Sequence, residues 1–390
     1  MKVFIRGGAL GIALLALSGT AQAVSINTDG RLVISAEDGT FSARISGRLH
    51  ADANIYDSDR VEHDSGAFVR RARIGVMGHI RNWDYEVTFD NATDESDLKD
   101  AFVARQLGPG RLIVGQFKQF QGFEEITSSN DIVFIERSHV SNSMIARALG
   151  VGYHGTRGFM GYAVSGYNLR EASDGGARAV DDGVGGVLRL YAAPIQRDRT
   201  ALHLGFSFSR EVSDLGGTRG RLRPLGRSDE GRFTLFDASS GRDDVAEDAR
   251  ATVDRLNMEL AALHGPVAFE AEWLVGSAEP DDAPDQDFSA YHAQISYALT
   301  GGSPRRYDLG EGRTKNLRPS TGSIGAFEVA LRYQFAENEA VPGAELTTVD
   351  TALNYYPNRN VRFMLNYSMA ENALTGDEPN LLSFRAQVAF

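Results

Sequence analysis

Arginine is the residue type in this chain that most plainly suggests a chemical role. Of the 40 basic residues, 36 are arginine and only four are lysine. A guanidinium stays charged at any working pH, and its planar fork of N–H donors matches two oxygens of a phosphate group. These side chains therefore suit the binding of small anions, although a GC-rich genome would explain the arginine total equally well.

Several arginines recur at every second position. In the segment 41 to 54, Arg44 and Arg48 take one face of a strand and apolar residues take the other, because successive side chains of a strand point to opposite faces. The next strand repeats the pattern with Arg71 and Arg73. Acidic residues fall on equivalent faces, namely Glu86, Asp90, Glu259, Glu270, Glu272, Glu328 and Asp350. Any preference for anions then depends on how the charges are segregated.

Alternation of apolar and polar residues extends over most of the chain. It is the pattern of strands that face lipid on one side and water on the other. The strands are expected at 41 to 54, 67 to 80, 82 to 91, 98 to 107, 110 to 117, 148 to 156, 158 to 167, 183 to 193, 200 to 211, 252 to 264, 266 to 276, 287 to 300, 323 to 336, 346 to 356, 360 to 370 and 380 to 390. Their even number predicts an all-β fold, a closed 16-stranded antiparallel transmembrane β-barrel with no unpaired edge in lipid.

The two ends of the chain carry features of an exported protein. Residues 1–23 combine basic residues, an apolar stretch and Ala21-Gln-Ala23, which predicts a signal peptide cleaved after Ala23. We expect residues 24–40 to form a short N-terminal periplasmic segment and residues 41–390 to form the barrel. The alternating last strand ends on Phe390, and an aromatic end of this kind resembles the assembly signal of outer-membrane barrels, although an ordinary last strand would look similar. These features predict the bacterial outer membrane as the location.

Connector lengths alternate between short and long. Tight turns such as Gly108-Pro-Gly110 are expected to face the periplasm, and longer loops to join the strands at the other end. The connector 300 to 322 is long where a short turn is due, so we expect it to fold into the lumen. The connector 118–147 is the longest of the first half and is the candidate for an inward-folded constriction loop.

Charge and motif content exclude several classes of function. The net charge is −12 for the whole chain and becomes −14 without residues 1–23, so nucleic-acid binding is not expected. The eight histidines are scattered, and neither Gly-x-Ser-x-Gly nor His-Glu-x-x-His occurs. We expect no enzyme activity, no cofactor and no metal site, and we interpret the acidic stretch 243 to 248 as a solvated surface loop.

Short stretches across the chain resemble the phosphate-selective porin O and P family of outer-membrane channels. Each match is modest, and their order along the chain makes the resemblance specific. The stretches are Phe41-Ser-Ala-Arg-Ile-Ser-Gly-Arg-Leu-His-Ala-Asp52, Phe68-Val-Arg-Arg-Ala72, Trp83-Asp-Tyr-Glu86, Thr127-Ser-Ser-Asn130, Ile135-Glu-Arg137, Arg221-Leu-Arg-Pro224, Tyr291-His-Ala-Gln-Ile-Ser-Tyr-Ala-Leu-Thr-Gly301 and Gly325-Ala-Phe-Glu328.

The resemblance implies a trimer of barrels in which arginines guide anions to a constricted site. Matching positions supply substrate-binding residues on the wall, at the constriction and in a long loop. They are Arg48, Arg70, Arg71, Arg137, Arg221, Arg223, Arg227 and Arg232. Arg44, Arg73, Lys118 and Glu125 complete the set as secondary lumen residues.

One position departs from the family pattern. Where the family has a lysine after the glutamate of its constriction loop, this chain has Glu125 after Glu124. At an effective dielectric constant near 20, a carboxylate about 4 Å from a bound phosphate repels it by roughly 4 kcal/mol. Glu125 therefore argues against tight phosphate selectivity and leaves a looser anion channel or a general channel open.

Together these features predict an outer-membrane porin through which small anions such as phosphate or polyphosphate diffuse passively. A general or weakly selective porin for small hydrophilic solutes is the alternative, followed by an outer-membrane barrel enzyme or a plugged structural barrel. The expected partners are outer-membrane lipid and lipopolysaccharide, further copies of the chain in a homotrimer, the barrel assembly machinery through Phe390, and small anionic solutes.

Overall fold

The structure, a computed structural model, describes residues 24–27, 32–93, 96–169, 183–214, 219–238, 249–281, 283–300, 302–320 and 324–390. The expected signal peptide, residues 1–23, and the acidic stretch 243 to 248 lie outside these ranges. Within them the chain is mostly β-strand, as the alternating pattern predicts.

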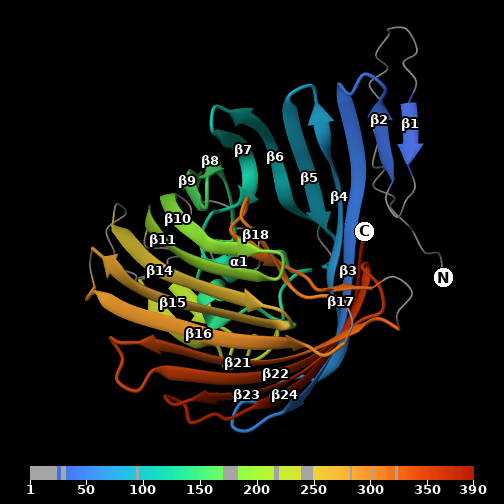
Figure 1. Cartoon of the computed structure of the whole chain (residues 1–390). Coiled ribbons are helices and arrows are strands. Elements are labelled where there is room, and N and C mark those ends of the chain that lie inside the picture. The colour runs from blue at the N-terminus through green and yellow to red at the C-terminus, as the bar shows by residue number, and fades with distance from the viewer. Residues whose placement is uncertain are drawn as a thin grey trace, which may run out of the picture.

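Sixteen long antiparallel strands form a closed barrel (Figure 1). In chain order they are β3 (Phe41–Asp57), β4 (Gly66–Ile80), β5 (Trp83–Asp90), β6 (Asp97–Leu107), β7 (Gly110–Lys118), β8 (Arg147–Arg157), β9 (Met160–Asn168), β10 (Gly183–Arg197), β11 (Thr200–Asp214), β14 (Arg250–His264), β15 (Val267–Pro280), β16 (Gln286–Ala298), β21 (Ala326–Asn338), β22 (Glu345–Tyr356), β23 (Val361–Asn372) and β24 (Asn380–Ala389). The barrel closes where β24 pairs with β3, from Asn380 opposite Asp57 to Ala389 opposite Arg48. The predicted strand number and closure are both confirmed.

The wall is apolar outside and polar inside. In β11, Leu204, Phe206 and Phe208 are exposed on the outer face, whereas Ser207 and Ser209 between them are fully buried. The other strands repeat this alternation, so a belt of apolar side chains surrounds a lumen lined with polar and charged groups. This is the side-chain distribution of a barrel with lipid outside and water inside.

Residues 24–27 and 33–36 extend the sheet at its N-terminal end. They form β1 (Val24–Asn27) and β2 (Val33–Ala36), which pair with each other, and β2 pairs with the first residues of β3 (Figure 1). Sequence analysis anticipated a short segment here but not that it would continue the barrel sheet.

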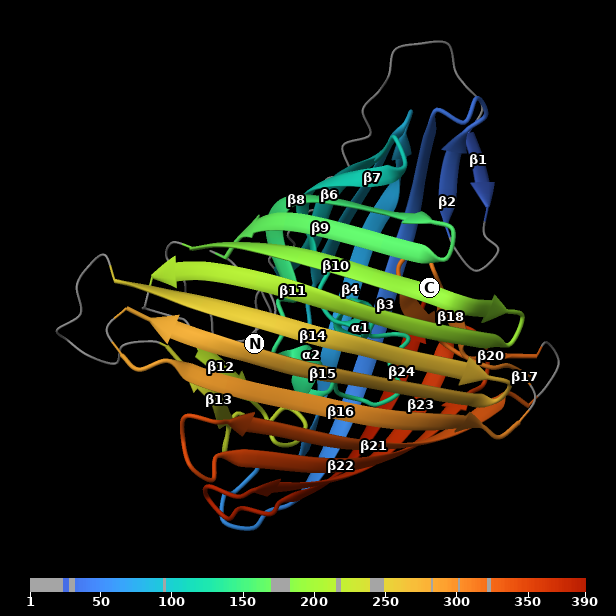
Figure 2. The same ribbon diagram turned by 60° about the vertical axis from the view of Figure 1, so that its left-hand side comes forward.

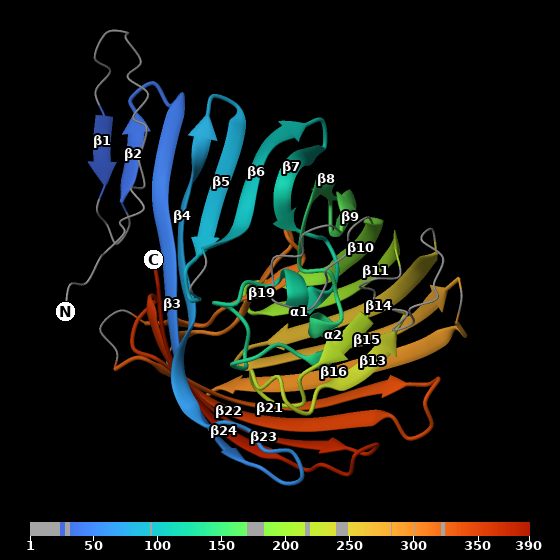
Figure 3. The same ribbon diagram turned by 180° about the vertical axis from the view of Figure 1, so that it is seen from behind.

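Three connectors fold into the lumen (Figures 2 and 3). The constriction loop, residues 119–146, carries α1 (Phe123–Ile126) and α2 (His139–Asn142). The long-loop hairpin consists of β12 (Arg219–Leu222) and β13 (Phe233–Asp237). The inner connector, residues 299–325, carries β17 (Gly302–Ser303), β18 (Arg306–Asp308), β19 (Arg313–Lys315) and β20 (Arg318–Pro319). Among the described residues, no helix is long and apolar enough to cross a membrane.

The long-loop hairpin is held inside by apolar packing. Leu222, Leu235 and Phe236 are nearly fully buried, and they belong to one apolar cluster with wall residues of β15, β16 and β22. The ring of Phe236 stacks on that of Phe288 with 4.6 Å between centroids. This contact fixes the arginines of the same hairpin relative to the wall.

Candidate functional site

The constriction loop is anchored by arginines that project inward from the wall. Arg362 on β23 donates to the backbone carbonyls of Ile132 and Val133 at 2.7 and 2.9 Å. Arg385 on β24 donates to the carbonyl of Ile135 at 2.7 Å. Charged donors make strong hydrogen bonds, so the loop backbone is fixed against this side of the barrel.

The opposite side of the loop is held by a wall carboxylate. Glu272 on β15 accepts hydrogen bonds from the backbone N–H groups of Phe123 and Glu124 at 2.6 and 2.9 Å, and from Asn257 at 2.8 Å. Glu272 thereby satisfies two N–H groups that open the short helix α1, which would otherwise lack partners.

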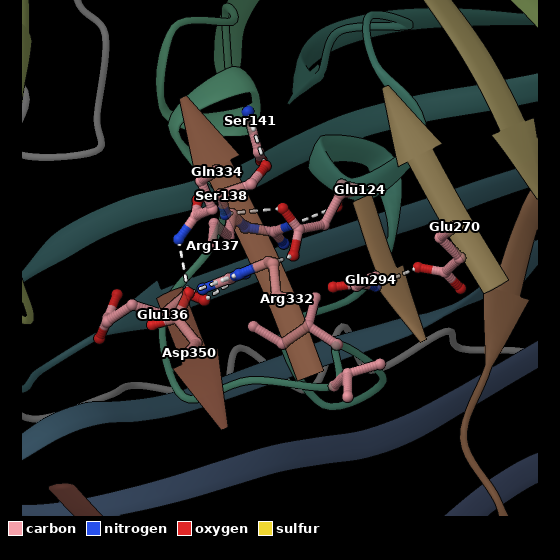
Figure 4. A network of polar contacts seen from close by, with 12 residues as sticks. Glu124, Glu136, Arg137, Ser138, Ser141, Glu270, Gln294, Arg332, Gln334 and Asp350 are labelled. Atoms are coloured by element: carbon pink, nitrogen blue, oxygen red, sulfur yellow. Dashed lines mark hydrogen bonds and ion pairs between the residues drawn. The ribbon is translucent and has the colours of Figure 1, made fainter. Parts of the chain in front are cut away.

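A polar network connects the middle of the loop to β21 and β22 (Figure 4). Arg332 donates to Asp350 at 2.9 Å and to the backbone carbonyl of Glu136 at 3.2 Å, and lies 3.5 Å from Glu124. Glu124 also accepts from the N–H of Ser138 at 2.8 Å. Burial alone would raise the pKa of Glu124, but Arg332 and nearby cationic groups outweigh burial and lower it, so the carboxylate is charged.

A cavity of about 310 Å³ lies between the constriction loop, the long-loop hairpin and the wall. Eleven basic and five acidic side chains line it, so positive charge is in excess. The basic residues are Arg70, Arg71, Arg73, Lys99, Arg137, Arg219, Arg221, Arg223, Arg227, Arg232 and Arg332. The acidic residues are Asp90, Asp97, Glu125, Glu136 and Asp350.

Seven of the eight arginines proposed from the sequence lie around this one cavity, although they come from distant parts of the chain. They are Arg70, Arg71, Arg137, Arg221, Arg223, Arg227 and Arg232. The eighth, Arg48, is not part of the lining and donates to Ser128 and Ser129 of the constriction loop. Of the secondary residues, Arg73 and Glu125 line the cavity. Arg44, which donates to the sulfur of Met77, and Lys118 do not.

A β-bulge explains how two consecutive arginines reach the cavity. His50 on β3 is opposite Arg71, whereas Ala51 is opposite Val69, so Arg70 is an extra residue in β4. A bulge interrupts the alternation of side chains, and both Arg70 and Arg71 therefore project inward. Arg70 forms a two-pronged ion pair with Glu136 of the constriction loop at 2.8 and 3.2 Å.

The basic residues of the cavity form two groups. Most are paired with carboxylates: Arg70 with Glu136, Arg73 with Asp90, Lys99 with Asp97, Arg137 with Glu125, Arg223 and Arg232 with Asp229, and Arg332 with Asp350. Four have no carboxylate within ion-pair distance among the described residues, namely Arg71, Arg219, Arg221 and Arg227. Arg71 is only 6 % exposed, and its Nε lacks a hydrogen-bond partner.

Three of these basic lining residues, Lys99, Arg219 and Arg332, were not among the site residues proposed from the sequence. Arg219 precedes the Arg221-Leu-Arg223 stretch by two positions, so the every-second-residue spacing was a usable signal. Lys99 offered no comparable signal, because its approach to the cavity depends on where β6 lies in the closed barrel.

Glu125, the residue that departs from the family pattern, is buried and neutralised. Its carboxylate lies 3.0 Å from Nζ of Lys118 and 3.2 Å from Nε of Arg137, and it accepts from the hydroxyl of Ser141 at 2.9 Å. Two cations share one anion here, so the repulsion of a bound anion by Glu125 is largely offset.

Comparison with known proteins gives a consistent assignment. The family model for phosphate-selective porin O and P matches residues 44–390. Porin O of Pseudomonas aeruginosa is 27% identical over 362 residues, which cover 83% of this chain and 80% of that protein. An uncharacterized protein of Caulobacter vibrioides is 27% identical over 355 residues, covering 85% of this chain and 69% of that protein.

Solved structures share the barrel architecture. A loop-deletion mutant of OmpT, an outer membrane protein of Vibrio cholerae, aligns with a TM-score of 0.60 at 11% identity, covering 90% of this chain and all of that one. An anion-selective porin from Comamonas acidovorans aligns with a TM-score of 0.58 at 12% identity, with the same coverage. At such identities these likenesses concern the fold alone. The match of the family model to nearly the whole barrel shows that the chain belongs to the phosphate-selective porin O and P family and is an outer-membrane porin.

Proposed function

We propose that this porin conducts small anions such as phosphate or polyphosphate by passive diffusion, and that the arginine-lined cavity is the site where they bind on their way through. The observation that carries the proposal is a group of four guanidiniums around one cavity that have no carboxylate partner in the part of the chain that the structure describes, namely Arg71, Arg219, Arg221 and Arg227. The description of the matching family, phosphate-selective porin O and P, supports the same substrate class.

The geometry suggests that the arginines around the cavity have two different roles. Paired arginines such as Arg70 and Arg73 hold the loop and the wall in place, and their positive charge is already balanced. Arg71 and Arg219 each have an Nε without a hydrogen-bond partner, which is a donor for an anion that has lost part of its hydration shell. Burial lowers the pKa of Arg227, and its neighbour Arg70 lowers it further, so a bound anion would stabilise the charged form.

A weakly selective porin for small hydrophilic solutes is the second candidate. The observation favouring it is that five carboxylates line the same cavity and that seven of the eleven cations there have an acidic partner. Conduction through such a site would depend on size more than on charge.

We also infer that the protein forms a homotrimer, contacts lipopolysaccharide at its outer surface, and is assembled through recognition of its C-terminal strand. One of the solved OmpT structures with this fold is described as a trimer form. Phe390 is half exposed at the end of the chain, where a recognition partner can reach it.

The test is a measurement of selectivity in a planar bilayer. The reversal potential across a potassium chloride gradient reports anion preference, and added phosphate reports block of the chloride current. Anion preference with phosphate block at low millimolar concentration would support the proposal. Weak or cation preference without block would favour the general porin.

Single substitutions link the result to the cavity. Arg71→Ala removes an unpaired guanidinium, and we expect it to weaken phosphate block by about ten-fold, the effect of one charge-assisted hydrogen-bonding partner worth about 1.4 kcal/mol. Arg199→Ala removes the same charge from an exposed short turn and serves as the control. Equal block in both variants would contradict the assignment of Arg71 to the anion path.

A further inference from the structure

We propose that Asp131 joins the constriction loop to the inner connector, and that this joint holds the two segments as one unit and so sets the aperture of the pore. The inference uses the porin fold and the packing of the lumen. It does not depend on which solutes the channel prefers.

Asp131 receives hydrogen bonds from three residues of the inner connector. Its carboxylate accepts from Nη1 of Arg313 at 3.2 Å and from the backbone N–H of Asn316 at 3.2 Å. Its backbone carbonyl accepts from Nη1 of Arg305 at 2.6 Å. The amide of Asn316 also donates to the carbonyl of Asn130. These contacts leave no passage for a solute between the two segments at this point.

The inner connector has its own anchors on one part of the barrel. The hydroxyl of Tyr307 hydrogen-bonds His203 of β11 at 2.6 Å, and Thr314 donates to Glu270 of β15 at 2.7 Å. Arg305 forms a two-pronged, fully buried ion pair with Glu328 of β21 at 2.7 and 2.9 Å.

The constriction loop around Asp131 is fixed to a different part of the barrel. Arg48 and His50 of β3 hold Ser129 and Asn130 at 2.8 and 3.1 Å, and Arg362 of β23 holds the backbone that follows Asp131. The joint therefore connects the inner connector, supported by β11, β15 and β21, to the stretch of the constriction loop that is supported by β23 and β3. Other parts of the constriction loop are held by Glu272 of β15 and Arg332 of β21, and Phe123 of the loop packs beside Tyr307 of the connector.

The joint lies close in sequence to residues that line the cavity. Glu136 and Arg137, which line the cavity, follow Asp131 by only five and six residues. Asp131 and Arg313 are 20% and 16% exposed at their side chains, so the ion pair is accessible to water but mostly enclosed. Releasing Asp131 would remove one support of the stretch that leads to these two lining residues, in addition to those from Arg385, Arg70 and Glu125.

The experiment uses two substitutions that change the lumen charge in opposite directions. Asp131→Ala removes a negative charge and Arg313→Ala removes a positive one. If these residues act only through their charge, the two variants shift anion selectivity oppositely and leave conductance nearly unchanged. If they form a joint, both raise single-channel conductance, by roughly two-fold, and the double variant gives no more than either single one.

A matched control is available on the same connector. Asp308→Asn removes a charge that pairs with Lys315 inside the connector. Among the described residues Asp308 has no hydrogen bond or ion pair with the constriction loop, so conductance should stay at the wild-type value. Asn316→Asp places a negative charge beside Asp131 at nearly constant volume and should raise conductance as the alanine variants do. The folded state of each variant is checked by its heat-dependent gel mobility.

A conductance that rises in one single variant and falls in the other, additive effects on conductance in the double variant, or unchanged conductance in Asp131→Ala and Asn316→Asp would each overturn the proposal. Because conductance is read separately from reversal potential, a failure of the joint is distinguishable from a failure of anion selectivity.

Discussion

The electrostatic effect of a lumen residue depends on the charged groups around it, and Glu125 is the clearest case. As an isolated acid it would repel anions, but Lys118 and Arg137 both lie within 3.2 Å of its carboxylate. Its role in the folded protein is to hold two cations together rather than to set the potential of the pore.

This arrangement predicts the outcome of Glu125→Lys, the substitution that would match the family pattern. The new ammonium would meet two existing cations, and at an effective dielectric constant near 20 each such contact at about 4 Å costs roughly 4 kcal/mol. We expect lower thermal stability and noisier current rather than tighter phosphate block. Thermal gel-shift assays and single-channel recordings measure both.

Glu125→Gln provides the comparison for that prediction. It removes the anion without adding a third cation, so its stability should lie between those of the wild type and Glu125→Lys. A Glu125→Lys variant that is as stable as the wild type and blocked more strongly by phosphate would show that the ion cluster does not form.

Alternation along the sequence predicts the inward orientation of Arg71 and Arg73 but cannot predict that of Arg70. The bulge that turns Arg70 inward arises from the register between β3 and β4, which a local pattern does not contain. The partners of Glu125 were hidden for a similar reason, because Arg137 approaches it only after the constriction loop has folded.

At the scale of elements, the constriction loop is held largely by charged groups, which makes its attachment sensitive to pH. Burial would raise the pKa of Glu136, but Arg70, Arg385 and Arg71 outweigh it and lower the pKa well below the usual range. The pKa of Glu124 is lowered as well. Burial lowers the pKa of His139 to about 4.

Acidification should therefore detach the loop in two stages. A lowered histidine pKa means that the detached loop binds more protons, so attachment begins to weaken as the pH falls from about 6.5 towards 4. The two carboxyl groups support attachment fully above their ordinary pKa of about 4.3, and this support is lost as the pH falls through their lowered values. Current noise recorded from pH 7 to pH 3 should increase first as His139 becomes protonated, and should increase further as the two carboxyl groups become protonated.

Two variants show which residue is responsible for each stage of detachment. Glu136→Gln should show increased noise already at neutral pH and a smaller change below pH 4, and His139→Gln should remove the dependence between pH 6.5 and 4. Noise that stays constant down to pH 3 in the wild type would rule out attachment of the loop by these groups.

Elements inside the lumen were harder to predict than elements of the wall. The inner connector was expected to fold inward because of its unusual length, and it does. The long-loop hairpin was not expected as a pair of strands. Its strands are only four and five residues long, and their stability depends on the packing of Phe236 against Phe288, a contact between distant parts of the chain.

For the molecule as a whole, the number of strands and the closure of the barrel followed from the sequence, because lipid on one side and water on the other impose alternation on every strand. The pairing of β24 with β3, which is the seam of the barrel, is the part of the closure that the local sequence pattern predicts least. Arg385 and Asp52 form a fully buried ion pair across it at 2.6 and 2.7 Å.

We expect Arg385→Met to destabilise the barrel strongly. It leaves Asp52 buried without its partner, and breaking a buried pair in this way costs roughly 3–5 kcal/mol. The loss of the bond to Ile135 also loosens the constriction loop. The temperature at which the folded band disappears on a gel should fall markedly.

The exposed pair of Arg210 and Asp254, also between adjacent strands, supplies the control for the seam. Arg210→Met should change stability little, because exposed ion pairs contribute little. Similar losses in both variants would mean that burial at the seam is not what makes the pair important.

One edge of β3 pairs with both β2 and β24, and this has a consequence for the assembly of the barrel. Ser383 and Asn54, which meet at the seam, are 329 positions apart, so this edge of β3 waits until the last strand has been synthesised. In the folded protein β2 covers the same edge at Ser42, Ala43 and Arg44, and this pairing does not require the last strand. Only the stretch from Arg48 to Asp57 stays open to unintended pairing with other chains, a hazard that unpaired strand edges carry in general. The pairing of β2 thus leaves a shorter edge of β3 unpaired before closure, with three residues covered by β2 and ten left for β24.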